Sequence, residues 1–69
     1  MTSKVREQIL AVRETGLVNM FDANGVQYVA YQQNAFELVN YLNDDVNRKE
    51  YAHFIMTGKA EITDVEDVE

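Results

Sequence analysis

Apolar residues recur at helical spacing along this chain, and start and stop signals for helices separate the recurrences. Val5, Ile9 and Val12 follow at intervals of four and three residues, which places them on one face of a helix. A hydroxyl residue stands at positions 2 and 3, where it can accept from an unpaired backbone N–H. Gly16 suits the left-handed position just beyond a helix end. We therefore predict a first helix over about residues 4–15.

A second helix is predicted to begin after Asp22, which is a favourable N-cap residue. Val26, Val29 and Ala30 then form its inner face. Gly25 weakens the first turn by roughly 1 kcal/mol relative to alanine. It either permits a close backbone approach or lies neutrally at the loop edge.

Two more helix starts are predicted in the second half of the chain. Asn34 with Glu37 has the spacing of a capping box, and Asn47 with Glu50 repeats it. Gly58 is a natural stop for the last helix. A short strand over residues 27–31 is the competing interpretation of the β-prone residues there. The core candidates after Asn34 are Phe36, Leu38, Val39 and Leu42.

These signals together predict an all-α fold, a compact bundle of three main helices plus a short fourth. With 69 residues the chain makes one domain, which we place at residues 1–59. No cysteine is present, so no disulfide can reinforce a fold of this marginal size. The predicted core comprises Val5, Ile9, Val12, Val26, Val29, Phe36, Val39, Leu42, Tyr51, Phe54 and Ile55.

The negative charge of the chain is concentrated at its C-terminal end. The net charge is −6, and five of the twelve acids lie in the last nine residues, which contain no lysine or arginine. Mutual repulsion of these carboxylates favours an acidic, disordered tail over residues 60–69. We accordingly expect that deleting residues 60–69 leaves the melting temperature nearly unchanged.

Most catalytic and metal-binding arrangements are missing from the sequence. Ser3 is the only serine and His53 the only histidine, so neither a Ser-His-Asp nor a Cys-His arrangement can be argued. We expect His53 to be a solvated surface residue. The acids lack the spacing of an EF-hand loop. The sequence thus predicts a non-enzymatic protein that needs no cofactor and no metal.

The sequence also limits the location and the partners of the protein. No apolar run approaches the roughly 18 residues of a membrane span, and the first residues lack a signal-peptide core, so we expect a cytoplasmic protein. No lysine or arginine occurs between Glu14 and Asn47. Because nucleic-acid affinity depends largely on cations, a small DNA-associated regulator of helix-turn-helix type is only an alternative. An acidic DNA-mimic inhibitor is another.

Exposed tyrosines are the strongest candidates for a binding surface. Tyr28 and Tyr31 point away from the predicted inner face of the second helix, and Tyr41 points away from that of the third. Tyrosine contributes large contact area while keeping a polar tip, which suits a protein interface. The competing interpretation is that these rings cover the edges of a small core. The function favoured is a protein-interaction module, whose partner is an unknown protein or a second copy in a homodimer.

Two segments of the chain resemble a known family. They are the run Asn19-Met20-Phe21-Asp22 and the run from Tyr51 to Lys59, and the opening from Arg6 to Arg13 is similar as well. The family consists of small uncharacterised proteins of Firmicutes bacteria and their phages, grouped as a domain of unknown function. The resemblance implies a small α-helical domain and a phage or prophage accessory protein. It transfers no catalytic residue.

Overall fold

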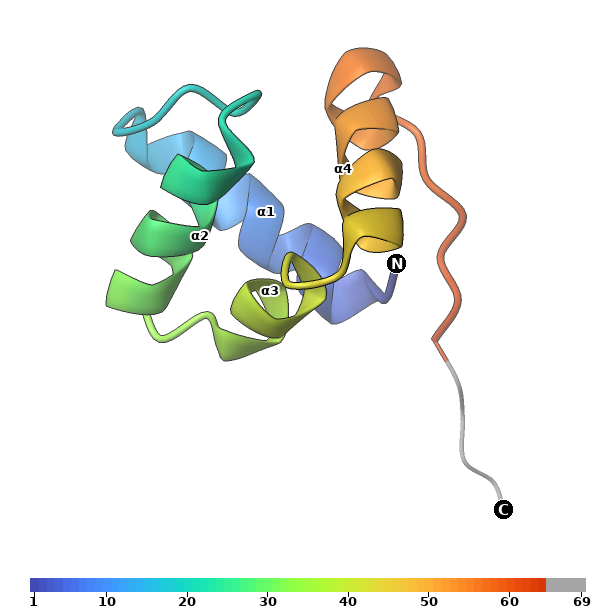
Figure 1. Ribbon diagram of the computed structural model, residues 1–69, viewed down its shortest axis with the longest axis horizontal. Coiled ribbons are helices and arrows are strands. Elements are labelled where there is room, and N and C mark those ends of the chain that lie inside the picture. The colour runs from blue at the N-terminus through green and yellow to red at the C-terminus, as the bar shows by residue number, and fades with distance from the viewer. Residues whose placement is uncertain (65–69) are drawn as a thin grey trace.

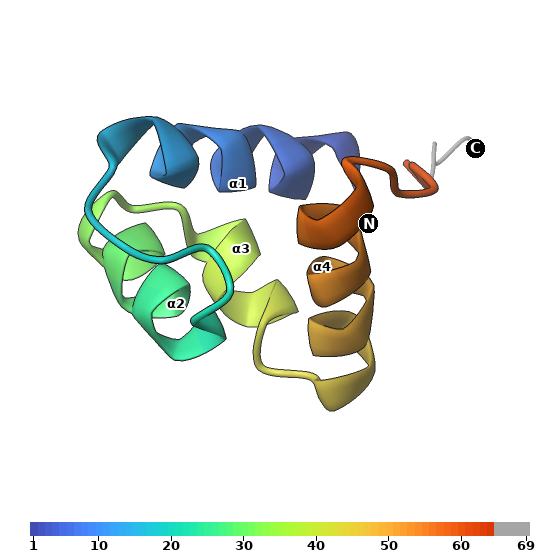
Figure 2. The ribbon, with the colours of Figure 1, turned by 90° about the horizontal axis from the view of Figure 1, so that it is seen from above.

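Four helices make up the part of the chain that the structure describes, residues 1–64 of a computed structural model (Figure 1). Helices α1, α2 and α3 pack against one another, while α4 stands at the end of the molecule away from α2 (Figure 2). The predicted all-α bundle of three main helices plus a short one is confirmed, and the short helix is α3. The helices are α1 (Ser3–Thr15), α2 (Ala23–Gln32), α3 (Phe36–Tyr41) and α4 (Asp45–Thr57).

The first two helices begin where their capping residues predict. The Thr2 hydroxyl accepts from the Val5 N–H at 3.1 Å, and the Asp22 carboxylate accepts from the Gly25 N–H at 3.1 Å. Residues 27–31 lie within α2, so the competing strand does not form. A Cβ atom on Gly25 would lie 2.7 Å from both Asp22 Oδ2 and Val18 Cγ2. Gly25 therefore lies in close contact, and the atoms that approach its backbone belong to the side chains of Asp22 and Val18.

The capping box predicted at Asn34 is wrong, because Asn34 ends α2 instead of starting α3. Its φ of 61° is left-handed, and the N–H of Ala35 donates back to the Ala30 carbonyl at 2.8 Å. This is the Schellman arrangement, in which asparagine can replace glycine. The N-cap of α3 is Ala35, which offers no side-chain acceptor. A residue from α1 supplies it, since Gln8 Oε1 accepts from the Leu38 N–H at 2.9 Å.

The predicted start of the last helix at Asn47 is also wrong, by three residues. Asp44 is the N-cap, and its Oδ1 accepts from the Val46 N–H at 2.8 Å. Asn47 lies inside α4, where its side-chain amide donates to the Tyr41 carbonyl at 3.0 Å. Arg48 similarly donates from Nε to the Leu42 carbonyl at 2.6 Å. Both side chains thus satisfy carbonyl groups at the end of α3.

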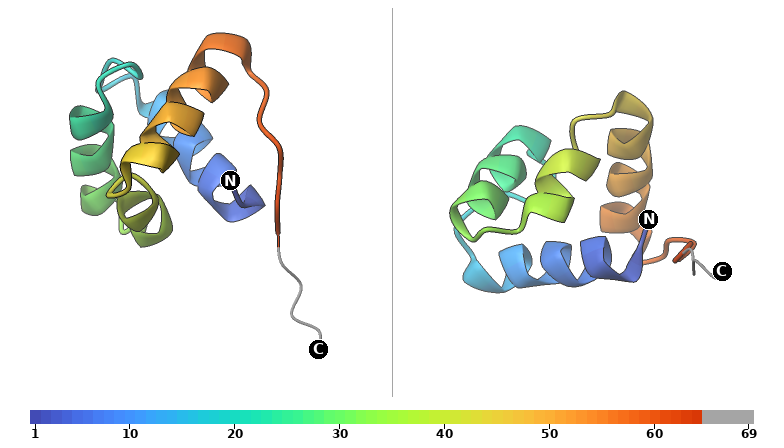
Figure 3. Two further views of the ribbon diagram at one scale, coloured as in Figure 1. Left: turned by 45° about the vertical axis from the view of Figure 1, so that its right-hand side comes forward. Right: turned by 90° about the horizontal axis from the view of Figure 1, so that it is seen from below.

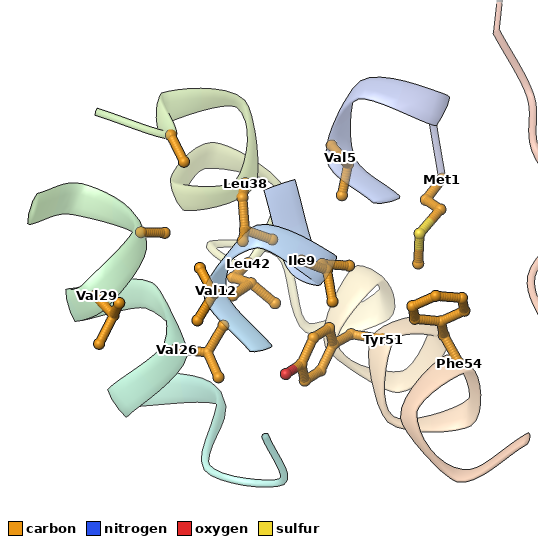
Figure 4. Close-up of a cluster of buried hydrophobic side chains, with 12 residues drawn as sticks. Met1, Val5, Ile9, Val12, Val26, Val29, Leu38, Leu42, Tyr51 and Phe54 are labelled. Atoms are coloured by element: carbon orange, nitrogen blue, oxygen red, sulfur yellow. The ribbon is translucent and has the colours of Figure 1, made fainter. Parts of the chain in front are cut away.

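The core lies where α1, α2, α3 and α4 converge (Figure 4). Of the predicted core, Val39 and Ile55 are only partly buried, and Phe36 is wrong because it is 47% exposed. Leu38 is fully buried in its place. The two residues are about 200° apart on a helix, so they cannot face the same core. The buried residues are Met1, Val5, Ile9, Val12, Val26, Val29, Ala30, Ala35, Leu38, Leu42, Tyr51 and Phe54.

Residues 60–64, which the sequence assigns to the disordered tail, instead run back beside the start of α1 (Figure 3). The N–H of Thr63 donates to the Met1 carbonyl at 2.9 Å, and the Met1 amine donates to the Glu61 carbonyl at 3.0 Å. The Asp64 carboxylate accepts from the Ser3 N–H and hydroxyl at 2.7 and 2.6 Å. Ile62 packs against the core. The rest of the predicted tail, residues 65–69, lies outside the described residues.

Candidate functional site

Two of the three predicted interface tyrosines lie together on the outer face of α2. Tyr28 and Tyr31 are one helical turn apart and are 63% and 62% exposed. The Tyr28 hydroxyl accepts from the Gln32 side-chain amide at 3.0 Å. The inner face of the same helix carries the buried residues Val26, Val29 and Ala30, so the helix cannot turn the tyrosines inward without losing part of the core.

A third aromatic residue, Phe36, joins this surface from the first turn of α3. Its ring centroid lies 5.8 Å from that of Tyr31, and the two planes meet at 66° in an edge-to-face contact. We call the surface formed by Tyr28, Tyr31 and Phe36 the aromatic corner. It lies at the α2–α3 turn, at the end of the molecule away from α4 (Figure 1). The sequence could have indicated that Phe36 and Leu38 do not both belong to the core, because their spacing places the two on different faces of a helix.

Tyr41 does not belong to the aromatic corner. Its side chain is half-buried, and its hydroxyl donates to Oε1 of Glu50 on α4. Burial raises the pKa of the Tyr41 hydroxyl above its ordinary value, and the neighbouring Glu50 carboxylate raises it further. Tyr41 therefore connects α3 to α4, whereas Tyr28 and Tyr31 face outward.

Glu50 is the centre of a polar cluster next to the core. Its Oε2 forms an ion pair with the Met1 amine at 2.9 Å, while its Oε1 accepts from Tyr41. The hydrogen bond from Tyr41 lowers the pKa of the Glu50 carboxyl, and the hydrogen bond from the Met1 amine lowers it further. The cluster thus holds Glu50 in its charged form and joins α3, α4 and the start of the chain.

Acidification should remove the contribution of this cluster to the stability of the protein. Since the pKa of Glu50 is lower in the folded than in the unfolded chain, its contribution is present above the ordinary carboxyl pKa, about 4.3, and disappears as the pH falls below it. We expect Glu50→Gln to melt below wild type at pH 7 and the difference to shrink towards pH 3, measured by circular dichroism. Glu14→Gln, in an exposed residue of α1, is the control. A difference that is constant from pH 7 to pH 3 would contradict the role of the Glu50 charge.

The three residues of the aromatic corner are uncharged, and the charged residue next to them in the sequence is acidic. Glu37 is the only charged residue between positions 23 and 43, and it follows Phe36 directly. Its Oε1 accepts from the Gln8 side-chain amide at 2.7 Å. This hydrogen bond is the main reason that the pKa of the exposed Glu37 carboxyl is lowered. The corner is therefore an exposed aromatic surface with one carboxylate that stays ionised.

The surface also has a pocket of about 310 Å³. It lies between α1 and α4, and Arg13 is the one charged residue in its wall. The C-terminal ends of α1 and α4 lie at it, since Arg13 is in the last turn of α1 and Gly58 is the C-cap of α4. It is lined by Ile9, Leu10, Arg13, Met20, Phe54, Ile55 and Gly58.

His53 is exposed on α4, as predicted. Among residues 1–64, no group of three or more histidine, cysteine, aspartate or glutamate side chains is arranged to hold a metal ion. In the same part of the chain, no helix has the length and apolar character that crossing a bilayer requires.

Comparison with known proteins identifies the chain by family. No curated protein and no solved structure matches it. One family model, described as a domain of unknown function, DUF5049, matches residues 1–59. These residues include all four helices and the aromatic corner, and they end just before the segment that runs beside Met1. The chain therefore belongs to the DUF5049 family, a domain family of unknown function.

Proposed function

We propose that this protein is a non-enzymatic protein-interaction module and that the aromatic corner is its binding surface. The observation that supports this proposal is the exposure of Tyr28, Tyr31 and Phe36, which are between 47% and 63% accessible. Aromatic side chains are enriched in protein interfaces because they bury a large area at a small cost in conformational entropy. Their position on the outer face of two helices means that binding requires no rearrangement of the core.

The amide side chains around the rings support the same proposal. Gln32 already contacts the Tyr28 hydroxyl, and Gln33 and Asn34 follow it in the turn, where both are exposed. Amides donate and accept hydrogen bonds, so they suit the polar rim that surrounds an apolar contact. A partner could thus bury the rings while pairing its own polar groups.

The cellular setting of the module is part of the proposal. It acts as a phage or prophage accessory protein, an origin that the sequence resemblance supports, and its place of action is the cytoplasm, which the lack of a signal-peptide core and of a long apolar run supports. A helix-turn-helix regulator is a weaker candidate, because residues 15–47 contain no lysine or arginine to contact phosphate. A DNA mimic is weaker as well, because Glu37 is the only acid on α2 and α3.

A double substitution in the aromatic corner tests the proposed function. We expect Tyr28→Ser/Tyr31→Ser to stay folded, because both side chains are exposed, and to lose the partner that wild type captures from a host lysate, since few residues carry most of the energy of an interface. Quantitative mass spectrometry of matched pull-downs measures the loss. Sedimentation of each variant at equal concentration shows whether the partner is a second copy.

The control is Val46→Ser/Met56→Ser, which removes two apolar side chains of α4 that are each 72% exposed. If this control loses the same partner, general surface hydrophobicity explains the capture and the assignment to the aromatic corner is wrong. If only His53→Ala loses the partner, the exposed face of α4 is the site instead.

A further inference from the structure

We propose that the aromatic corner binds a basic peptide segment of the partner protein, with an arginine side chain lying against the rings of Tyr31 and Phe36 beside the Glu37 carboxylate. This inference deepens the proposed function and rests on it, since it names the chemistry of the partner. Three features of the same corner favour a cationic group over a neutral or an acidic one.

The first feature is the aromatic surface itself. The faces of aromatic rings carry partial negative charge and attract cations within about 6 Å of the ring centroid. The edge-to-face contact of Tyr31 with Phe36 fixes the two rings in different planes, so that a planar guanidinium can lie on one ring while its stem contacts the other. Arginine suits such a place better than lysine, because its guanidinium is flat and more weakly hydrated.

The second feature is the carboxylate of Glu37, the residue that directly follows Phe36. Glu37 is exposed, and hydrogen bonding keeps its pKa low, so it is charged at neutral pH. Its Oε1 accepts from Gln8, and a hydrogen bond from its own backbone N–H also lowers its pKa. Because the carboxylate is exposed, a guanidinium at the corner could still donate to it.

The third feature is the end of α2. The C-terminal end of a helix carries partial negative charge, which a basic side chain in the last turn often complements. The last turn of α2 has no basic residue, although it lies directly beside Tyr31. Residues 15–47 contain no lysine or arginine, and the fold brings Lys4 of α1 near enough to Glu37 to lower the pKa of its carboxyl further.

The net charge of the protein also favours a basic partner. A net charge of −6 attracts a basic partner at long range and repels an acidic one. Long-range attraction alone does not select a place on the surface, because it is screened within about 8 Å at physiological salt. The exposed rings of the aromatic corner supply short-range contacts at one place on this acidic surface.

Titration of the full chain with a short peptide of alternating serine and arginine tests the inference. We expect the backbone NMR signals of Tyr31, Phe36 and Glu37 to shift, and a peptide of alternating serine and glutamate to leave them unchanged. Tyr31→Ser should weaken the affinity for the arginine peptide by about two- to fivefold, which is the range of an exposed cation–π contact. A lysine peptide should bind more weakly than the arginine peptide.

The matched pair of charge variants is Glu37→Gln and Glu14→Gln. Glutamine at position 37 keeps the oxygen that accepts from Gln8 while it removes the charge, so α3 should stay intact. We expect Glu37→Gln to weaken the affinity for the arginine peptide by about threefold, and Glu14→Gln to weaken it by less than about 1.5-fold at physiological salt. Equal weakening by both variants would show unspecific attraction to an acidic protein and would overturn the inference.

The outcomes also separate this inference from the proposed function. If the arginine peptide shifts no signal of the corner while Tyr28→Ser/Tyr31→Ser still loses the captured partner, the site is right and the chemistry of the partner is wrong. If the peptide binds at the corner but the double variant keeps its captured partner, that partner uses another surface and the proposed function fails at this site.

Discussion

Replacing Phe54 by alanine should destabilise the protein by about 3–5 kcal/mol, which is enough to unfold most molecules of so small a domain. The Phe54 ring is 7% exposed and lies against Met1, between α4 and the start of α1 (Figure 4). Phe54 also lines the pocket between α1 and α4, so its removal would enlarge an existing space that no neighbouring side chain fills. Urea unfolding followed by circular dichroism measures the change in the free energy of unfolding.

The matched control for this substitution is Phe36→Ala, which removes the same side chain from the aromatic corner. Because Phe36 is 47% exposed and contacts Tyr31 rather than the core, we expect it to cost less than about 1 kcal/mol. The pair therefore distinguishes the core that the structure shows from the one that the spacing in the sequence predicts. Equal costs for the two substitutions would mean that α3 is turned with Phe36 inward.

Ending the chain after Lys59 should lower the melting temperature by more than about 5 °C, which corresponds to roughly 1 kcal/mol in a domain of this size. The truncation removes Ala60 and Ile62, which pack against the core, and the backbone hydrogen bonds that Glu61 and Thr63 form with Met1. This expectation reverses the one drawn from the sequence, in which the tail was dispensable. Thermal unfolding at pH 7 measures the shift.

A second truncation, after Asp64, is the control for the first. It keeps every contact that the structure describes, including the carboxylate of Asp64 that accepts from Ser3. We expect it to melt clearly above the chain that ends after Lys59. If both truncations melt together with the full chain, the segment beside Met1 contributes nothing to stability and the sequence-based expectation was right.

The candidate site was predictable in part. Exposure of Tyr28 and Tyr31 followed from their position opposite Val26 and Val29 on a helix whose start was marked by Asp22. The sequence could not predict that Tyr41 lies outside the aromatic corner, because its hydrogen-bond partner Glu50 lies nine residues further along the chain in a different helix. A hydrogen bond between helices depends on how they cross, and spacing within one helix contains no information about that.

The starts of α1 and α2 and the ends of α1 and α4 are what the sequence by itself determined, because their signals act within about four residues. The caps Thr2 and Asp22 and the ends at Gly16 and Gly58 accept or donate to backbone groups one turn away, so local spacing predicted them correctly. At the last helix the local spacing predicted a start at Asn47, but Asp44 is the N-cap and Asn47 lies inside the helix, where its amide reaches the Tyr41 carbonyl.

The tertiary structure alone decided the orientation of α3, its cap and the course of residues 60–64. Helix α3 has six residues, and although Phe36 and Leu38 must lie on different faces, so short a pattern does not show which of the two faces the core. Burial of Leu38 beside Ile9 and Val12, and a cap from Gln8 thirty positions earlier, selected one phase. The path of Thr63 beside Met1 likewise joins opposite ends of the chain. Such contacts form only once the helices have packed, and no local pattern encodes them.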